Sequence, residues 1–432
     1  MTDAAAEPWP PTLLARTISV PEEALGSLFD LLPAASPACA LAWVRRGEGI
    51  IGWGEALRIE TSGEQRFAEA DQRWRDVAQH MVVRDEVRRP GTGPVAFGSF
   101  AFSPESEAGG TLVVPRVVAG RRGTAAWLTT ITSASELQPP PNPTALRTAR
   151  EEALARPDVT YTDGALPAPQ WGDAVADVVR LIKSRDVAKV VMARDVIAQL
   201  DSPVDVRRLL GALAEDYPTC WTFAVDSLVG ATPELLVRRE RGLLSSRVLA
   251  GTIQRTGNDE ADLARAASLA RSSKDLEEHE FAVDSLTRSL EPYAASTSAP
   301  EAPFVLHLPN VMHLATDVTA VLDDAHADMS SLQVAAALHP TAAVCGTPTD
   351  VAARIIAEHE HMDRARYAGP VGWIGADGDG EWGIALRSAE VAQDGRSLRL
   401  FAGCGIVAAS DPAAEIAESE AKLEPMRTAL AH

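Results

Sequence analysis

The strand-like segments of this chain follow one another through short turns instead of alternating regularly with helices. Pro370–Ile374 and Trp382–Val391 are apolar runs on either side of Asp377-Gly-Asp-Gly, which is a turn sequence typical of a β-hairpin. Val95–Phe102 and Ala188–Ile197 are further strand-like runs rich in β-branched and aromatic residues. Parallel βαβ units would require a helix between successive strands. The pattern therefore predicts an α+β fold.

Apolar residues at helical spacing predict the helices that accompany these strands. The predicted helices span Phe67–Val82, Trp171–Ile182, Glu260–Thr287, Ser330–Leu338, Pro348–His359 and Pro412–Leu430. The strongest break in the chain is Gln138-Pro-Pro-Pro-Asn-Pro, because consecutive prolines cannot donate hydrogen bonds to a helix or a sheet. At ~150 residues per domain the length favours two or three domains, although one large unit is also compatible with it. The break is then a linker or a surface connection.

The charge balance limits the classes of partner. The chain has 60 acidic and 40 basic residues among 432, a formal net charge of −20. Such a charge repels phosphate backbones, so we expect no nucleic-acid partner. A small dianionic substrate would be repelled as well, and its site would have to be built locally from basic side chains, backbone N–H groups or a metal.

Other features predict a reduced, cytoplasmic protein. No run of about 18 apolar residues is present, so we expect no membrane span. Met1–Pro11 has neither a basic nor an apolar region, which argues against a signal peptide. The cysteines are far apart and form no metal-binding or redox motif, which predicts reduced thiols that are mostly buried. They are Cys39, Cys220, Cys345 and Cys404.

Two predicted helices carry acidic side chains at helical spacing. Asp275 and Glu278 are three residues apart, as are Glu415 and Glu418, and Lys422 lies on the same side as the second pair. Four carboxylates that converge from two helices could bind Mg²⁺, which prefers oxygen ligands. The alternative is that both faces are simply solvated.

A lysine and a glutamate stand in apolar surroundings. Lys189 lies within the strand-like run Lys189-Val-Val-Met-Ala-Arg, either at a strand edge or in a pocket, where a desolvated amine could act as a base. Glu234 lies between a proline and apolar residues, where a raised pKa would suit a general acid. Glu358-His-Glu-His lacks metalloprotease spacing, and we interpret it as a solvated helix end.

Ten segments, in this order, resemble those of the chorismate-utilising enzymes, a family that includes isochorismate synthase, salicylate synthase, anthranilate synthase component I and aminodeoxychorismate synthase. The resemblance covers roughly residues 170–425. The segments are Lys189-Val-Val-Met-Ala-Arg, Gly230-Ala-Thr-Pro-Glu-Leu-Leu, Leu249-Ala-Gly-Thr, Lys274-Asp-Leu-Glu-Glu-His-Glu, Val311-Met-His-Leu-Ala-Thr, Leu338-His-Pro-Thr-Ala-Ala-Val-Cys-Gly, Gly369-Pro-Val-Gly-Trp, Ile384-Ala-Leu-Arg, Phe401-Ala-Gly-Cys-Gly-Ile-Val and Glu415-x-x-Glu-x-x-x-Lys-Leu.

The resemblance implies one α+β unit over residues 1–432. It implies two large antiparallel β-sheets packed face to face with helices outside, as in anthranilate synthase component I. Residues 1–160 would form the variable N-terminal half, and residues 165–430 the catalytic half that carries the motifs. The proline-rich stretch would then be a surface connection.

The resemblance also implies roles for particular residues. Mg²⁺ would be held by Glu278 and Glu418, with Asp275 and Glu415 binding directly or through water. The pyruvyl carboxylate of chorismate would meet Arg387, Lys422 and the backbone of Gly405. Further substrate contacts would come from Thr252, His313, Ala343 and Tyr367. A metal and a basic clamp suit a dianion in an acidic protein.

Within this family, Lys189 indicates that water, not ammonia, is the nucleophile. Lys189 would take a proton from the water that attacks C2 of chorismate, and Glu234 would protonate the departing C4 hydroxyl on the other face of the ring. The product would be isochorismate, for menaquinone or siderophore biosynthesis. Ala343 stands where lyases and aminating members usually have Thr, which favours the isochorismate synthase branch.

Two other functions stay open at this point. Salicylate synthases share Lys189 and Glu234 and then eliminate pyruvate, and Tyr367 stands where some isochorismate synthases have Phe. A catalytically inactive binding relative is the other alternative, although the catalytic set of residues is complete. No amidotransferase pattern is visible, so we expect no such subunit, and we expect a monomer.

Overall fold

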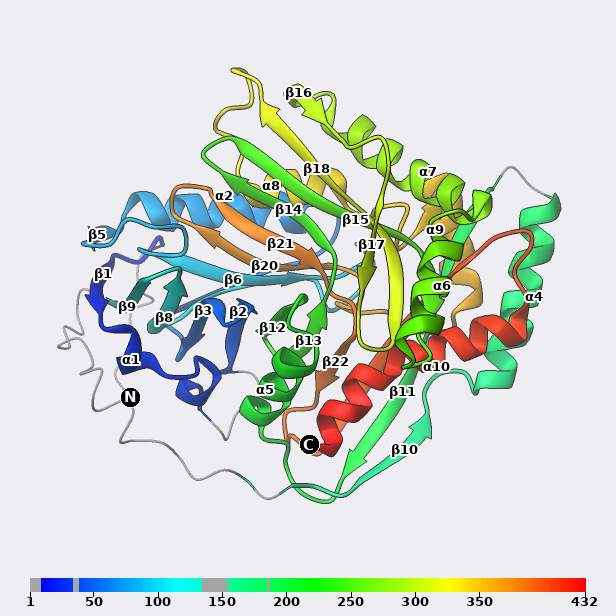
Figure 1. The fold of residues 1–432 in the computed structure, drawn as a ribbon. Helices are drawn as coiled ribbons and strands as arrows, with labels where there is room; N and C mark the ends of the chain where they lie inside the picture. The colour runs from blue at the N-terminus through cyan, green and yellow to red at the C-terminus, as the bar shows by residue number, and fades with distance from the viewer. Residues whose placement is uncertain (1–8, 34–38, 134–153, 155, 185–186) are drawn as a thin grey trace.

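The computed structural model describes residues 9–33, 39–133, 154, 156–184 and 187–432, and it leaves out the side chains of Lys274 and Glu278. The predicted break at Gln138–Pro143 lies outside the described residues. Within these residues the strands form a 13-stranded sheet and a 10-stranded sheet, called here the larger and the smaller sheet (Figure 1).

The larger sheet has the strand order β10-β11-β23-β22-β13-β12-β2-β3-β8-β9-β1-β5, and β19 pairs with β11. Its strands are β1 (Leu13–Val20), β2 (Leu41–Arg45), β3 (Glu48–Trp53), β5 (Val82–Asp85), β8 (Val117–Arg122), β9 (Ala125–Ser133), β10 (Val159–Asp163), β11 (Lys189–Leu200), β12 (Trp221–Val225), β13 (Leu228–Thr232), β19 (Gly346–Thr347), β22 (Ser388–Val391) and β23 (Ser397–Ile406). The pair β1–β5 is parallel, whereas the other strand pairs of both sheets are antiparallel.

The smaller sheet has the order β16-β18-β15-β14-β21-β20-β6-β7-β4, and β17 pairs with β18. Its strands are β4 (Leu57–Thr61), β6 (Val95–Phe100), β7 (Gly110–Val114), β14 (Leu235–Glu240), β15 (Leu243–Gln254), β16 (Ala294–Ser298), β17 (Phe304–His307), β18 (Val311–Leu322), β20 (Pro370–Gly375) and β21 (Gly380–Ile384). The helical elements are α1 (Glu22–Leu25), the 3₁₀ turn η1 (Phe29–Leu31), α2 (Arg66–Gln79), α4 (Ala168–Ser184), α5 (Val206–Asp216), α6 (Asp259–Leu269), α7 (Ser273–Leu290), α8 (Ser331–Leu338), α9 (Thr349–His359) and α10 (Pro412–Ala431).

The two sheets pack face to face through a layer of large apolar side chains. Trp43 and Phe223 from the larger sheet meet Phe97 and Trp373 from the smaller sheet in one buried cluster. Successive side chains of a strand point to opposite faces, and Ala224, next to Phe223, accordingly belongs to the cluster on the outer face of the larger sheet. These strands are apolar on both faces because the other sheet covers one face and helices cover the other.

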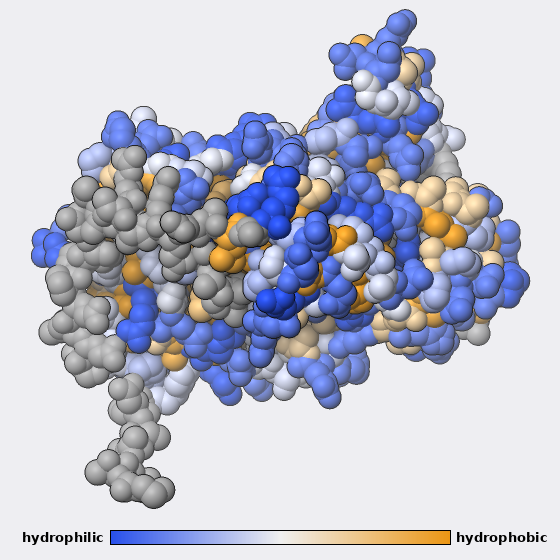
Figure 2. All heavy atoms as spheres, turned by 90° about the horizontal axis from the view of Figure 1, so that it is seen from below, coloured by the Kyte–Doolittle hydropathy of each residue, from blue (hydrophilic) through white to orange (hydrophobic). Residues whose placement is uncertain are grey.

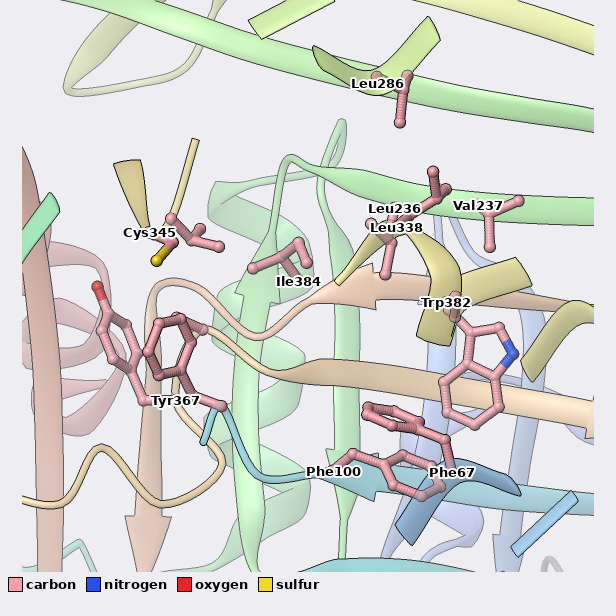
Figure 3. Close-up of a cluster of buried hydrophobic side chains, with 14 of the residues drawn as sticks. Phe67, Phe100, Leu236, Val237, Leu286, Leu338, Cys345, Tyr367, Trp382 and Ile384 are labelled. Atoms are coloured by element: carbon pink, nitrogen blue, oxygen red, sulfur yellow. The ribbon is translucent and has the colours of Figure 1, made fainter. Parts of the chain in front are cut away.

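Helices cover the outer faces, as the family resemblance implied. The helices α2, α7 and α8 pack on the smaller sheet, and α5 and α10 pack on the larger sheet (Figure 1). Figure 3 shows Phe67 of α2 against Phe100 of β6, with Trp382 of β21 beside them, and the Phe67 and Phe100 ring centroids are 4.5 Å apart. The expected α+β class with two large, mostly antiparallel sheets is confirmed.

One predicted strand is in fact two. The hairpin at Asp377–Gly380 is present, but Trp382–Val391 is not a single strand, because β21 ends at Ile384 and β22 begins at Ser388 in the other sheet. Arg387, between them, has a positive φ of 49°, which breaks the extended backbone. The predicted helix over Glu260–Thr287 is likewise divided into α6 and α7.

Among the described residues on the face shown in Figure 2, hydrophilic side chains predominate, in keeping with the charged composition. Among the described residues, no helix combines the length and the apolar character that crossing a membrane requires.

Candidate active site

A polar cavity lies where the chain passes from one sheet to the other. Pro233 and Glu234 connect β13 of the larger sheet to β14 of the smaller sheet, and Leu386 and Arg387 lie in the return connection from β21 to β22. All four residues line the cavity. At such crossings the backbone leaves both sheets, so polar side chains can be held there without interrupting either apolar layer.

Twelve of the thirteen residues that the sequence analysis selected line this one cavity. They are Lys189, Glu234, Thr252, Asp275, His313, Ala343, Tyr367, Arg387, Gly405, Glu415, Glu418 and Lys422. The thirteenth, Glu278, lies in α7, and its side chain is outside the described part of the structure.

The acidic side chains come from the N-terminal parts of two helices. Asp275 lies in the first turn of α7, which is capped by Ser272, and Glu415 lies in the first turn of α10, which is capped by Asp411. Glu418 is one turn further along α10. The positive end of a helix dipole stabilises nearby carboxylates, which offsets part of the repulsion between these three.

Lys422 forms an ion pair with Glu418, one of these three carboxylates. Its Nζ is 2.6 Å from a Glu418 carboxylate oxygen and donates a hydrogen bond to the Gly403 carbonyl at 2.8 Å. Burial acts to raise the pKa of Glu418, but Lys422 together with Arg387 and Lys189 outweighs burial, and the pKa is lowered. Both groups are therefore charged at neutral pH.

His313 is held between Thr252 and Arg387. An Nη atom of Arg387 lies 3.4 Å from His313 Nε2, and the Thr252 hydroxyl lies 3.0 Å from His313 Nδ1. Arg387 has no acceptor, so Nε2 accepts and Nδ1 carries the proton and donates to Thr252. Burial, with Arg387 and Lys422, lowers the pKa of His313 well below its usual value, so the imidazole is neutral.

Glu234 is the buried acid of the cavity. Its side chain is 5 % exposed, and burial raises its pKa to about 8, against the opposing effects of Lys189, Arg387 and Lys422. The carboxyl group therefore carries a proton at neutral pH and can donate it. This is the environment that the sequence analysis expected for Glu234.

Two glycines allow close approaches at the site. Gly251 has φ of 74° at a bulge in β15, and a Cβ placed on it would lie 3.2 Å from Cβ of Asp275. A Cβ on Gly403 would lie 3.0 Å from the Tyr367 hydroxyl. Side chains at these positions would push α7 or Tyr367 away from the cavity.

The sequence analysis missed Arg364, which also lines the cavity, and misplaced its partner Glu360. Glu360 is not at a solvated helix end: it is 2 % exposed and paired with Arg364, which is 3 % exposed. The only signal in the sequence was an acid and a base four residues apart, which is common on exposed helices. Cys404 was expected to be buried, and it is, with Sγ close to Glu415 and Glu418.

Known proteins similar to this chain identify its relatives. The family model described as "Chorismate binding enzyme" matches residues 36–431. Isochorismate synthase MenF of Bacillus subtilis is 30% identical over 408 residues, which cover 88% of this chain and 85% of that protein.

Two solved structures share the fold. The menaquinone-specific isochorismate synthase MenF of Escherichia coli has a TM-score of 0.79 at 25% identity, over 97% of this chain and 95% of that one. Anthranilate synthase component I of Streptococcus pneumoniae, at 19% identity, has a TM-score of 0.67 over 89% of this chain and 92% of that one, which supports the fold alone. The chain belongs to the chorismate-binding enzymes.

Proposed function

We propose that this protein is an isochorismate synthase, an isomerase that converts chorismate to isochorismate. The observation that carries the proposal is that Lys189 and the protonated, buried Glu234 line the same cavity as a cluster of basic side chains. A relative named isochorismate synthase aligns over most of the chain. The product would serve menaquinone or siderophore biosynthesis.

The basic side chains of the cavity suit the pyruvyl carboxylate of chorismate. Arg387 is buried and directed toward His313, and Lys422 lies next to Gly403. Together with the backbone of Gly405, these two cations would bind the carboxylate. Ala343 and Tyr367 would shape the wall around the ring, and Thr252 and neutral His313 would supply hydrogen bonds without adding charge.

The acidic side chains suit Mg²⁺. Asp275, Glu415 and Glu418 line the cavity, and oxygens of Glu415 and Glu418 lie within 4.8 Å of each other and of Cys404 Sγ. Burial raises the pKa of the Cys404 thiol well above its usual value, so carboxylates and not sulfur are the fitting ligands. We include Glu278 on the family resemblance. Bound Mg²⁺ would draw electrons from the ring carboxylate and so favour attack at C2.

In the proposed reaction, one water molecule adds to the ring at C2 and the C4 hydroxyl leaves as another. Lys189 accepts a proton from water as its oxygen bonds to C2, the ring double bond shifts, and the C4–oxygen bond breaks. Glu234 donates its proton to the departing C4 hydroxyl, which leaves as water. No atoms are gained or lost overall, as an isomerisation requires.

Salicylate synthase activity is the second candidate, because it needs the same base and acid, and Tyr367 is the residue that keeps it open. It differs from the first by the loss of pyruvate. Purified protein should be incubated with chorismate and either Mg²⁺ or excess EDTA, and the products separated by chromatography. We expect isochorismate with Mg²⁺ and none with EDTA. Salicylate and pyruvate would favour the second candidate, and bound but unchanged chorismate would favour an inactive relative.

Replacing the proposed base should stop the reaction but not folding. For Lys189→Ala we expect kcat to fall at least ~100-fold, because general base catalysis contributes about that much or more. Lys183→Ala, an exposed lysine of the preceding helix α4, is the matched control and should keep normal turnover. Near-normal kcat in Lys189→Ala would remove Lys189 from the mechanism.

The proposed acid predicts a pH dependence. Glu234 must be protonated to donate, so kcat/KM should decline as the pH rises through about 8, where the carboxyl loses its proton. The measurement is kcat/KM between pH 6 and pH 9.5 for the wild type, together with kcat for Glu234→Gln, which should fall at least ~100-fold. A rate that stays constant to the alkaline limit would argue against a protonated Glu234.

Removing a proposed metal ligand should change the metal requirement. In Glu418→Gln we expect the Mg²⁺ concentration for half-maximal activity to rise at least ~10-fold, because a charged ligand becomes neutral. Glu424→Gln alters an exposed carboxylate on the same helix and serves as the control. The measurement is a Mg²⁺ titration of the initial rate, and identical curves for Glu418→Gln and wild type would exclude Glu418 as a ligand.

A further inference from the structure

Along one stretch of β11, the strand that begins with Lys189, side chains from elsewhere take the place of a neighbouring strand on one edge. On one side β11 pairs with β23 from Val190 to Gln199. On the other side it pairs with β19 at Lys189 and Val190, and with β10 only from Val196 onward. Between these two pairings, the edge of β11 has no strand partner among the described residues.

The outward backbone groups of Val191 and Ala193 on this edge are nevertheless hydrogen-bonded. The Val191 N–H donates to the Cys345 carbonyl at 2.8 Å, and the Val191 carbonyl accepts from Arg364 Nη2 at 2.7 Å. The Ala193 N–H donates to Glu360 Oε1 at 2.7 Å, and the Ala193 carbonyl accepts from the Trp171 indole at 2.9 Å. Glu360 and Arg364 thus supply one acceptor and one donor to the ladder.

These two residues form one rigid, buried unit. Arg364 Nε donates to Glu360 Oε2 at 2.8 Å, and Nη2 donates to Glu360 Oε1. The guanidinium also lies 4.3 Å from the centre of the Phe102 ring. A bidentate pair whose guanidinium also donates to backbone carbonyls has few alternative arrangements.

The same unit also contacts the segment of the cavity wall that contains Val344. Arg364 Nη1 donates to the Val344 carbonyl at 2.9 Å, next to Ala343, and the Tyr367 N–H donates to the Arg364 carbonyl at 2.9 Å. Val191 lines the cavity on the same face of β11 as Lys189, because the two residues are two positions apart. Arg364 therefore ties together the strand of Lys189, the Val344 wall and the segment before Tyr367.

We propose that Glu360 and Arg364 are positioning residues for the reaction, and that they hold Lys189 and the Ala343–Val344 wall at the separation that the chemistry needs. This proposal rests on the proposed function. A misplacement of about 1 Å is enough to reduce turnover ~100-fold, whereas substrate binding through Arg387 and Lys422 would remain.

The first test is Arg364→Lys, which keeps the charge but cannot make the forked bonds to Glu360, Val191 and Val344 together. We expect kcat for isochorismate formation to fall ~100-fold and KM for chorismate to change less than ~3-fold. Glu360→Gln is the second variant, in case the first does not fold. Leu210→Ala, in the buried face of α5, is the control that lowers stability away from the cavity.

The second readout is hydrogen–deuterium exchange of the peptide that spans residues 189–195. We expect faster exchange there in both variants, and unchanged exchange there in Leu210→Ala. A folded Arg364→Lys protein with normal kcat would overturn the proposal. An equal loss of kcat in Leu210→Ala would also overturn it, when each variant is assayed at the same number of degrees below its own melting temperature. General destabilisation would then explain the effect.

Failure of the proposed function is distinguishable from failure of this inference. If the wild type leaves chorismate unchanged, the proposed function fails. Hydrogen–deuterium exchange of residues 189–195 then decides alone whether Glu360 and Arg364 hold β11 in place. Exchange that remains slow in both variants would overturn this inference as well, whereas faster exchange confined to this peptide would support it.

Discussion

The apolar layer between the two sheets is the interaction on which the rest of the molecule depends. Large side chains such as Trp43, Phe97 and Phe223 fill the space between the facing sheets and are almost completely buried. A strand that contributes side chains to this layer therefore runs within one sheet along its whole length, and the chain can change sheets only between strands. Two of the places where the chain changes sheets, Pro233–Glu234 and Ala385–Arg387, lie at the polar cavity.

Charge within the cavity is separated into a basic and an acidic group, although the chain as a whole is strongly acidic. Lys189, Arg387 and Lys422 are near the neutral, protonated Glu234, and all three act on its pKa. The acidic group lies at the N-terminal turns of α7 and α10, whose dipoles favour negative charge. Lys422 pairs with Glu418 and joins the two groups. A dianion and a divalent cation would complement this arrangement.

The Glu360–Arg364 pair illustrates how a buried ion pair can serve geometry more than stability. Burial of two charges costs about as much free energy as their attraction returns, so such a pair is weak evidence of stabilisation. Here its hydrogen bonds reach β11 and the Val344 segment as well as each other. The pair joins parts of the chain that are far apart in the sequence and that meet at the cavity.

The sequence by itself determined the class of fold, most of the strands and helices, and twelve residues that now line one cavity. Local periodicity suffices for the class and the elements, because it records which side chains are apolar and which share a helix face, as Glu415, Glu418 and Lys422 do. Other cavity residues, such as His313 and Arg387, were selected through the resemblance of their motifs to those of the chorismate-utilising enzymes. Only the tertiary structure decided that Trp382–Val391 is divided between two sheets and that Glu360 is buried. Both depend on what packs against a segment from elsewhere in the chain, and short-range periodicity carries no information about that.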